Sequence, residues 1–531
     1  MPAIITDQFR ILNAETFVKS FTGIGTTANN YYTFLGHPNP TNTLVDNYGT
    51  SDWSTNQPDP KDSFEQEMSY HDSMMFMKRV TSSDVARVIP RRNWTIGTTY
   101  DMYKHDIDID NGALVSNSKT LYNSNYYVIN SEFKVYLCVN NGANESKPNG
   151  KKSLYEPNFV AAAVAQAGTI DDGYRWKYLY TLTPSEIIKF TTDSYIPVPA
   201  NWGTGETALV KDASVDGKIE TIIVTKVGTG YQKTGGLSSG DITGVPILGN
   251  GTGATATVTI SGGQVTAITM ENGGSGYTKG LINFTPQAIS DLTAGSGAEF
   301  EVIIPPKGGH GADVYRELGA LRVMLYSKYD NENDYITGNN FSRVGIVKNP
   351  VEYTGNNFYT EQTATTLGAL KLKPGVGGGT TAGTVYNVNS QISQEVTISG
   401  VTTARAIGYV ASWDPNTGVL RYYQPVGFVT STYVGTAGNR LYDFAGEDDG
   451  ADTNAVQGAA TGSPLVPDIS MDNISSVIIG GEVKQLGQTF NDGKANPEVK
   501  KYSGEIIYID NRAPITRSAS QKEEVKIVVE F

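Results

Sequence analysis

The chain has 531 residues, of which 39% are hydrophobic and 10% aromatic, and it contains 58 glycines and 31 tyrosines. This composition allows sizeable cores, excludes a disordered chain, and at this length predicts about two to four domains. The net charge of −13 repels phosphate backbones and argues against nucleic-acid binding.

Two helices are predicted in the first 80 residues. Asn13 is expected to cap a short helix that stops at Gly23, because Asn favours N-caps and Gly favours the left-handed residue after a helix. A second helix is predicted to begin at the capping-box residues Ser63 and Gln66 and to run to about Val80.

Beyond residue 80 the pattern is mostly that of strands. Tyr126–Ile129 and Phe133–Val139 flank a polar turn and are predicted to form a hairpin. A third helix is predicted after Thr183, where Pro184 and Glu186 follow. Abundant Gly with Thr, Val and Asn favours short strands joined by tight turns. We therefore expect a mainly β fold with a few helices in long loops.

An internal repeat lies within residues 206–304. Two Gly-x-Gly-Tyr sequences end at Tyr231 and Tyr277, and two Gly-x-Gly-Ala sequences end at Ala254 and Ala298. A period of about 45 residues predicts two stacked β units of a small sandwich or prism-like module. Each glycine turn is expected to use a positive φ while the tyrosine closes over the corner.

A second distinctive stretch covers residues 360–497. The glycine-rich residues after Lys373 are predicted to form a flexible connector. Ile407–Trp413 and Val419–Tyr423 surround an Asp-Pro-Asn-Thr-Gly turn and predict a hairpin. Residues Ala445–Ser463 are acidic and rich in Gly and Ala, which predicts an exposed loop.

At the end of the sequence, Tyr502–Ile515 and Gln521–Phe531 are two runs that alternate apolar and polar residues. They surround a polar turn and predict a β-hairpin that ties this part of the chain into a sheet.

Chemically reactive motifs are weak. The single cysteine, Cys138, excludes intrachain disulfides and a Cys-based zinc site, and its apolar strand predicts a buried thiol. The four histidines have no metal-ligand spacing. His71, beside Asp72, is interpreted as structural; His310 lies among glycines that could present an imidazole, but no Ser or Cys nucleophile motif accompanies it.

His105–Asn117 superficially resembles an EF-hand calcium loop. Its glycine comes one residue late and its twelfth position is Asn117 instead of Glu, so we interpret the alternating Asp and Ile residues as a strand with a solvated acidic face. The acidic stretches at 330–334 and 447–449 are weaker candidates. Two sequences resemble phosphate-binding loops but are incomplete. The one at 149–153 lacks the upstream glycine of a P-loop, and the one at 203–208 does not lie between a clear strand and a helix. We predict no catalytic residue, no metal and no cofactor.

Arg91, Arg92 and Trp94 are the candidate protein–protein interface. They combine bidentate donors with a large amphipathic ring, the residue types enriched at interface anchors. Alternatively, the two arginines brace a loop against acidic groups of the protein itself. Both interpretations are open.

The sequence also contains five blocks, in order, that resemble one family. Gly-Glu-Ile-Ile-Tyr-Ile-Asp-Asn-Arg-x-Pro-Ile at 504–515, with Glu-Glu-Val-x-Ile at 523–527, resembles the end of the gene-eight baseplate wedge subunit of T-even-type contractile-tail bacteriophages. Residues 3–10 resemble that family's opening strand. The other blocks are Val88–Trp94, Asp172–Tyr180 followed by Tyr195–Val198, and Phe341–Glu352.

The resemblance implies a structural virion protein and not an enzyme. It implies a layered β-sandwich core with helices in long loops, a homodimer, and neighbouring wedge proteins as partners in the tail baseplate, which reorganises on host contact. The core would comprise 1–205, 305–359 and 498–531, interrupted by two β-rich insertions at 206–304 and 360–497 that have no counterpart in the shorter T-even form. The sequence lacks a long apolar run and a secretory signal, so we expect synthesis and assembly in a host cytoplasm without membrane insertion.

Two other function classes remain open. A receptor- or carbohydrate-binding tail module would use the insertion at 206–304, with Tyr231, Tyr277 and, from the second insertion, Trp413 as aromatic platforms. The sequence favours buried corner residues as the interpretation of the two tyrosines. A tail-associated hydrolase would require a cleft with paired carboxylates.

Overall fold

The computed structural model describes residues 4–23, 29–37, 53–330, 340–375, 380–398, 401–424, 442–444, 454–516 and 521–531. Strands account for 43% and helices for 11%, so the predicted mainly β class is confirmed. The chain divides into two compact units. The first contains Met1–Val18, Val85–Leu325 and Ile527–Phe531, and the second contains Lys19–Asp84 and Tyr326–Lys526.

Outside the repeat region, two sheets of the described structure contain strands of the first unit. The strands of a four-stranded sheet, in order, are β27 (Glu523–Glu530), β15 (Arg322–Tyr329), β3 (Val85–Pro90) and β7 (Tyr195–Pro197). A three-stranded sheet contains β4 (Tyr127–Ile129), β5 (Lys134–Asn141) and β6 (Tyr174–Thr181). The register Tyr127↔Leu137 confirms the hairpin predicted between β4 and β5.

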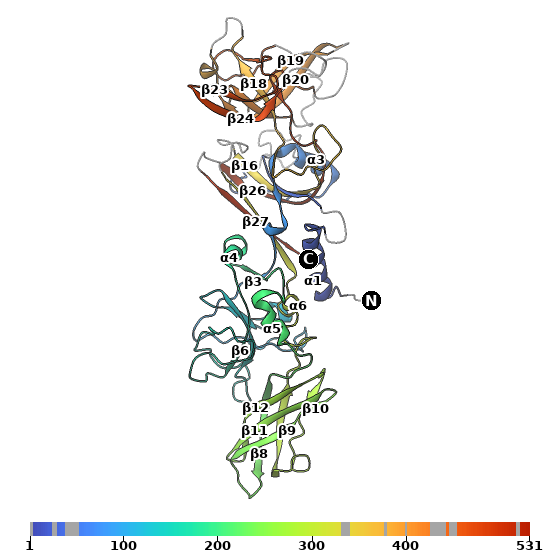
Figure 1. The fold of residues 1–531 in the computed structure, drawn as a ribbon, viewed down its shortest axis with the longest axis vertical. Helices are drawn as coiled ribbons and strands as arrows, with labels where there is room; N and C mark the ends of the chain where they lie inside the picture. Colours follow the sequence, from blue (N-terminus) through green and yellow to red (C-terminus); the bar gives the residue numbers. More distant parts are fainter. Residues whose placement is uncertain are drawn as a thin grey trace. The chain divides into compact units, whose positions relative to one another are not determined.

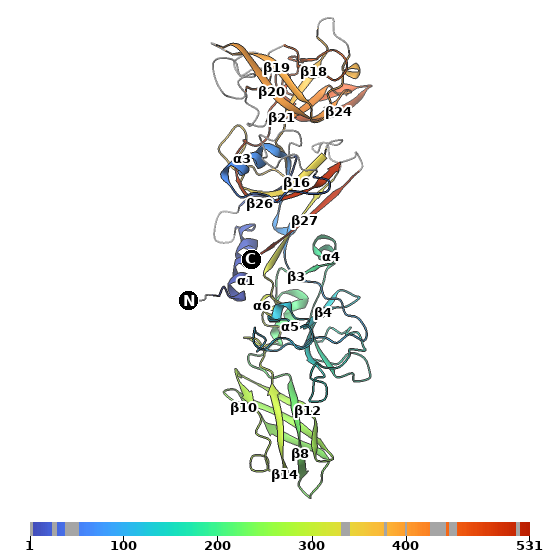
Figure 2. The ribbon, with the colours of Figure 1, turned by 180° about the vertical axis from the view of Figure 1, so that it is seen from behind.

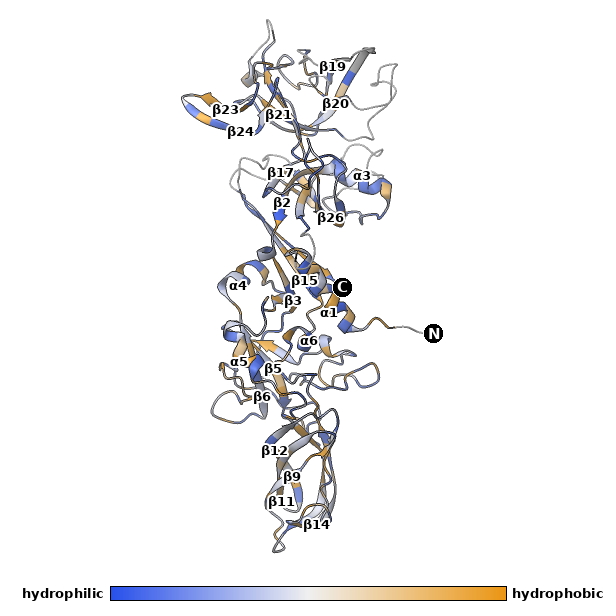
Figure 3. Cartoon of the chain, turned by 45° about the vertical axis from the view of Figure 1, so that its right-hand side comes forward, coloured by the Kyte–Doolittle hydropathy of each residue, from blue (hydrophilic) through white to orange (hydrophobic). Residues whose placement is uncertain are grey.

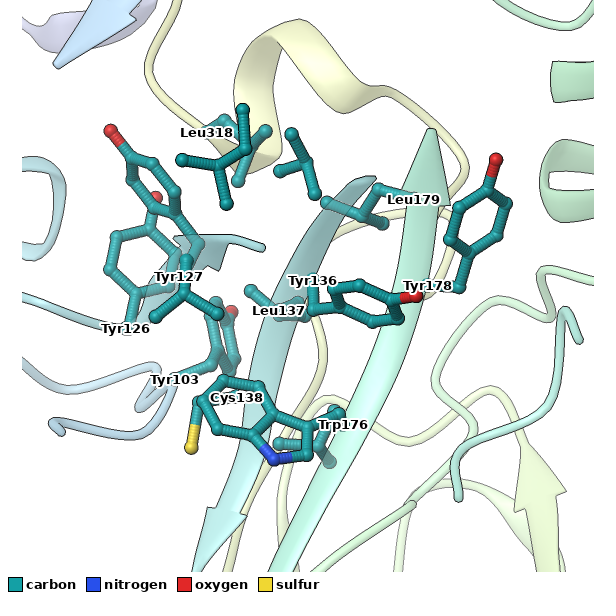
Figure 4. Packing of buried hydrophobic residues seen from close by; sticks show 14 of the residues in the cluster. Tyr103, Tyr126, Tyr127, Tyr136, Leu137, Cys138, Trp176, Tyr178, Leu179 and Leu318 are labelled. Atoms are coloured by element: carbon teal, nitrogen blue, oxygen red, sulfur yellow. The ribbon is translucent and has the colours of Figure 1, made fainter. Parts of the chain in front are cut away.

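A tyrosine-rich core surrounds this three-stranded sheet (Figure 4). Trp176 is fully buried and its ring stacks on Tyr174 at 5.3 Å. The hydroxyl of Tyr126 donates to the Glu317 carbonyl (2.6 Å), and that of Tyr127 donates to the Pro90 carbonyl (2.6 Å). Each ring therefore fills the core while its hydroxyl satisfies a loop carbonyl. Cys138 is buried in this core, as predicted, and burial raises the pKa of its thiol.

The repeat region forms its own set of strands (Figure 1). These are β8 (Ile222–Lys233), β9 (Gly240–Pro246), β10 (Leu248–Gly249), β11 (Thr252–Ser261), β12 (Gln264–Ser275), β13 (Gly280–Leu281) and β14 (Leu292–Val302). The sheet pairings are β14-β8, β12-β11-β9 and β10-β13, so strands of this module pair with one another in the described structure.

The two repeats are interleaved rather than stacked, which corrects the prediction. Tyr231 of the first repeat accepts a hydrogen bond from the backbone N–H of Ala298 in the second (2.9 Å). Conversely, Tyr277 of the second accepts from Ala254 of the first (3.3 Å). Both tyrosines are buried, and the glycines before them have positive φ, as expected. Each half completes the other because its first strand pairs with the other half's last.

The second unit contains two larger sheets. Its five-stranded sheet has, in order, β17 (Thr363–Thr365), β2 (Met74–Val80), β1 (Tyr31–Gly36), β16 (Asn340–Lys348) and β26 (Glu505–Thr516). The other contains β19 (Gln391–Ile398), β20 (Val401–Asp414), β21 (Val419–Tyr423), β18 (Gly368–Lys373) and β22 (Val466–Pro467), with β25 (Lys494–Ala495) beside β18 (Figure 2). A separate hairpin joins β23 (Ile474–Ile479) and β24 (Glu482–Phe490). The predicted hairpin of β20 and β21 is confirmed.

The helices are short. They are α1 (Asp7–Ser20), α3 (Phe64–Ser73), α4 (Pro184–Phe190), α5 (Ala208–Asp212) and α6 (Val314–Glu317), with 3-10 turns at Ser82–Asp84, Leu121–Asn123, Gly205–Thr207 and Thr381–Gly383. At α4 the predicted N-terminus is confirmed, since Thr183 and Glu186 form a reciprocal capping box.

Two helix predictions were wrong at one end. Asn13 lies inside α1 and does not cap it. The Thr6 hydroxyl caps the first turn instead, since it accepts a hydrogen bond from Phe9 N–H (3.3 Å). At the other end, Gly23 follows the helix with φ +67°, as expected. Of the block at 3–10, residues 4–6 are not in a strand and residues 7–10 lie in α1, contrary to the expected opening strand. Ser63 caps α3 as predicted, but Met74–Val80 forms β2, because its first four residues are all buried and fit a strand covered on both faces.

The predicted terminal hairpin was also wrong in its pairing. β26 pairs with β16, with Arg343 opposite Asn511, whereas β27 lies beside β15 in a different sheet. The alternation of apolar and polar residues identified both strands correctly. However, the two strands pair with β16 and β15, which lie far away in the sequence, and not with each other. The connector residues 376–379 and the first part of the predicted loop, 445–453, lie outside the described residues.

Candidate interface site

Arg91, Arg92 and Trp94 lie on the segment that follows β3. The backbone continues the contacts of the strand: Ile129 N–H donates to the Arg92 carbonyl (2.8 Å), and Trp94 N–H donates to the Ile129 carbonyl (2.9 Å). Because this segment is held on β4, the positions of all three side chains are set by sheet geometry and not by a free loop.

The two guanidinium groups bind oxygens of the protein itself. Arg91 Nη1 donates to the Thr192 carbonyl (3.1 Å). Arg92 Nε donates to Asn125 Oδ1 (3.1 Å), and Arg92 Nη2 donates to the Tyr122 carbonyl (3.0 Å). The structure therefore brings the arginines together as braces, but their partners are amide and carbonyl oxygens and not the acidic groups that the sequence suggested.

Aromatic contacts complete this arrangement. The Arg92 guanidinium lies 4.3 Å from the centre of the Tyr127 ring, a cation–π contact. Trp94 is half-buried against the tyrosine-rich core, and its Nε1 donates to Ser153 Oγ (3.1 Å). Since both arginines and the tryptophan are only half-buried, their outer faces can still contact a partner, and the interface role stays a prediction.

Replacing Arg92 by Ala is expected to lower the free energy of unfolding by about 2–3 kcal/mol, because two hydrogen bonds and the contact with Tyr127 are lost. Urea unfolding of the purified chain measures this. Arg316→Ala is the control, since that exposed arginine forms a surface ion pair with Asp313, worth about 0–1 kcal/mol. Equal effects of the two substitutions would contradict a bracing role.

His71 and Asp72 lie at the edge of a 240 Å³ cavity within the second unit. Asp72 Oδ1 accepts from the Tyr502 hydroxyl (2.7 Å) and from Lys501 Nζ (2.6 Å). Burial lowers the pKa of His71 to about 4, with Lys501 adding to the effect and Asp72 opposing it. This environment fits the structural role that was predicted. Sequence analysis missed the cavity because its walls come from segments far apart in the chain.

His310 is buried against Glu317, which corrects the idea that its glycines present it openly. Its Nδ1 lies 2.5 Å from Glu317 Oε1, and Glu317 Oε2 accepts from Gly311 N–H (2.7 Å). The edge of the imidazole meets the Tyr103 ring at 4.7 Å. The pair thus holds the turn before α6 in place.

The calcium-like segment is a turn-rich loop and not the strand that was predicted. Asp108 Oδ1 accepts the N–H groups of Asp110 (2.9 Å) and Asn111 (2.8 Å), and these bonds lower the pKa of Asp108. Asn111 Nδ2 donates to Asp106 Oδ2 (2.8 Å). The polar spacing therefore serves the loop's own turns. Among the described residues, no group of three or more His, Cys, Asp or Glu side chains is arranged to hold a metal. Residues 331–334 and 447–449 lie outside them.

The proposed aromatic platforms are not flat exposed rings. Tyr231 and Tyr277 are only 1% and 2% exposed. Trp413 is half-buried, and its Nε1 donates to the Thr384 carbonyl (2.9 Å). Two of the three residues that the binding-module alternative needs are therefore inaccessible.

Comparison with known proteins adds no family assignment, since no protein-family model and no curated protein matches the sequence. Of the helices that the structure describes, none is both long and apolar enough to cross a membrane.

Proposed function

We propose that the chain is a structural subunit of the baseplate wedge of a contractile-tail bacteriophage. The observation that carries this proposal is where the family-like blocks lie. The block at 88–94 begins on β3, whose Val88 pairs with Pro197 in the block at 195–198. The block at 341–352 begins on β16, whose Arg343 pairs with Asn511 in the block near the end. The blocks are thus sheet partners despite long separations in sequence.

The repeat module supports the same division into core and insertion. Its strands pair among themselves in the described structure, and they connect to the remainder of the first unit at Ile222 and Val302, which are directly paired. A module whose entry and exit lie side by side can be inserted into a core without disturbing its sheets.

The mechanical role fits a rigid subunit. The buried tyrosines pin loop carbonyls with hydrogen bonds, so the loops are held to the core. In a baseplate that reorganises on host contact, such a subunit would move as a body while its interfaces with itself and with neighbouring wedge proteins repack.

Light scattering behind a sizing column tests the proposal first. A dimer near twice 57.1 kDa is expected for a homodimeric wedge subunit. A trimer, which is typical of fibres and adhesins, would contradict it and favour receptor binding. In the phage that encodes the chain, deletion of 206–304 separates the same alternatives, because particles that assemble without adsorbing would assign the module to binding, whereas failed assembly would assign it to the scaffold.

A further inference from the structure

An open groove lies beside the repeat module in the first unit. β8 and β12 run antiparallel and are joined near their ends, where Ile219 N–H donates to the Gly273 carbonyl (2.9 Å) and Tyr231 N–H donates to the Gly263 carbonyl (3.0 Å). Between these bonds the two strands belong to different sheets. A 490 Å³ groove follows this separation and is closed on its other side by residues from the β5 and β6 region.

The groove is bordered by the edge of β12. All six residues from Thr266 to Glu271 line it. A strand that presented only one face would contribute alternate residues, so a continuous run shows that the backbone edge borders the groove. β11 occupies the opposite edge of β12. A strand edge along a groove is the geometry to which an extended peptide adds as a further strand.

The walls of the groove are suited to such a peptide. Ile222 and Val224 of β8 and Met270 of β12 supply apolar surface. Glu220, whose side chain is only 9% exposed, also lines the groove, and its Oε2 is buried with no hydrogen-bond donor among the described residues. Its other oxygen lies 3.4 Å from Lys218 Nζ. A buried carboxylate oxygen without a donor is rare, and an added strand would reach it only if the Glu220 side chain turned outward.

The segment before α1 has the matching properties. Ile4 and Ile5 are 86% and 69% exposed, and this short apolar segment projects from α1 (Figures 1 and 3). β-Branched residues fit a pleated strand with a half-buried face. Asp7 follows at the start of α1. The groove is lined by three cations and two carboxylates (Lys151, Arg175, Lys218, Glu220 and Glu271), so its charge balance favours an acidic residue.

We propose that Ile4–Thr6 of a second copy of this chain add as a short strand to the free edge of β12, with one of the two isoleucine side chains against the apolar wall. Two copies exchanging these segments reciprocally would bury the groove twice about a twofold axis. This proposal rests on the homodimer in the proposed function and specifies its contact.

Disulfide trapping tests the contact directly. Cys138 is buried, so engineered cysteines are the reactive ones. In the full chain, Ile4→Cys combined with Thr269→Cys in β12 is expected to give a disulfide between two chains under mild oxidation, seen as a doubled mass on a non-reducing gel. The matched control combines Ile4→Cys with Thr243→Cys, an exposed threonine on β9 at the other edge of the same sheet. Equal trapping in both pairs, or a disulfide only within one chain, would overturn the proposal.

A second measurement avoids cysteine chemistry. Ile4→Asp is expected to weaken self-association about tenfold or more, because the apolar wall would have to bury a charge. Leu12→Asp is the control, since Leu12 is also exposed (54%) but lies outside the docking segment. If a dimer forms and both substitutions weaken it equally, the proposed strand contact is wrong but the chain is still a homodimer. A chain that is monomeric throughout overturns both.

Discussion

Gly274→Ala is expected to lower the free energy of unfolding of the repeat module by about 3–5 kcal/mol. Gly274 has φ +63°, which disfavours any side chain. A Cβ there would lie 2.5 Å from the Thr252 carbonyl oxygen and 2.6 Å from the Ala254 nitrogen. Both are backbone atoms of a paired strand, so neither can move away without breaking the β11–β12 ladder.

A neighbouring glycine separates the close contact from the backbone conformation. Gly276 has φ +75°, but a Cβ there would find its nearest neighbour 3.9 Å away, at the Gly251 Cα. Gly276→Ala is therefore expected to lower the free energy of unfolding by about 1–2 kcal/mol, which is the cost of the positive φ without a steric clash. Urea unfolding of both variants measures the difference, and equal losses would show that the close approach between the repeats is absent.

Acid is expected to destabilise the second unit well before most carboxylates titrate. His37 and His71 are both buried, and burial lowers the pKa of each from 6.5 to about 4. Between these values the unfolded chain binds more protons than the folded one, so stability is full above about pH 6.5 and falls as the pH approaches 4. The nominal loss is about 3 kcal/mol for each histidine across that window.

His71→Gln tests this pH dependence, because glutamine is polar but does not titrate. Unfolding free energies of wild type and variant, measured by urea titration between pH 7 and pH 4.5, should show a shallower decline in the variant. The variant's own loss at pH 7 is a separate, pH-independent offset. If both proteins decline with the same slope, the folded-state pKa of His71 is not lowered.

Local signals predicted the fold where the chain's neighbours in sequence are also its neighbours in space. The capping box at Thr183 needs only four residues, and the β4–β5 hairpin needs one turn. The helix predicted over Met74–Val80 was wrong because consecutive apolar residues fit a buried helix and a buried strand equally well. The interleaving of Tyr231 with Ala298 is a contact over 67 residues, which periodicity does not encode.

The candidate interface was predictable in its residue types but not in its contacts. Arg91 and Arg92 stand out in the sequence, yet their acceptors come from Thr192, Tyr122 and Asn125. Backbone carbonyls carry no sequence signal, so the braces became visible only in three dimensions. The groove was missed for a related reason, since Glu220 becomes unusual only through its burial without a donor.

The late position of β26 and β27 has a consequence for synthesis on the ribosome. β16 cannot complete its pairing until β26 has been synthesised, about 160 residues later. In the same way, β15 cannot pair with β27 until the later of the two strands has been made. Until residues 505–530 have emerged, both earlier strands expose unpaired edges, which favour aggregation over folding. A chain cut short before residue 505 therefore lacks a strand from each sheet, and one cut between residues 516 and 523 lacks β27. A premature stop codon at either place is expected to give misfolded chains rather than a shortened but folded product.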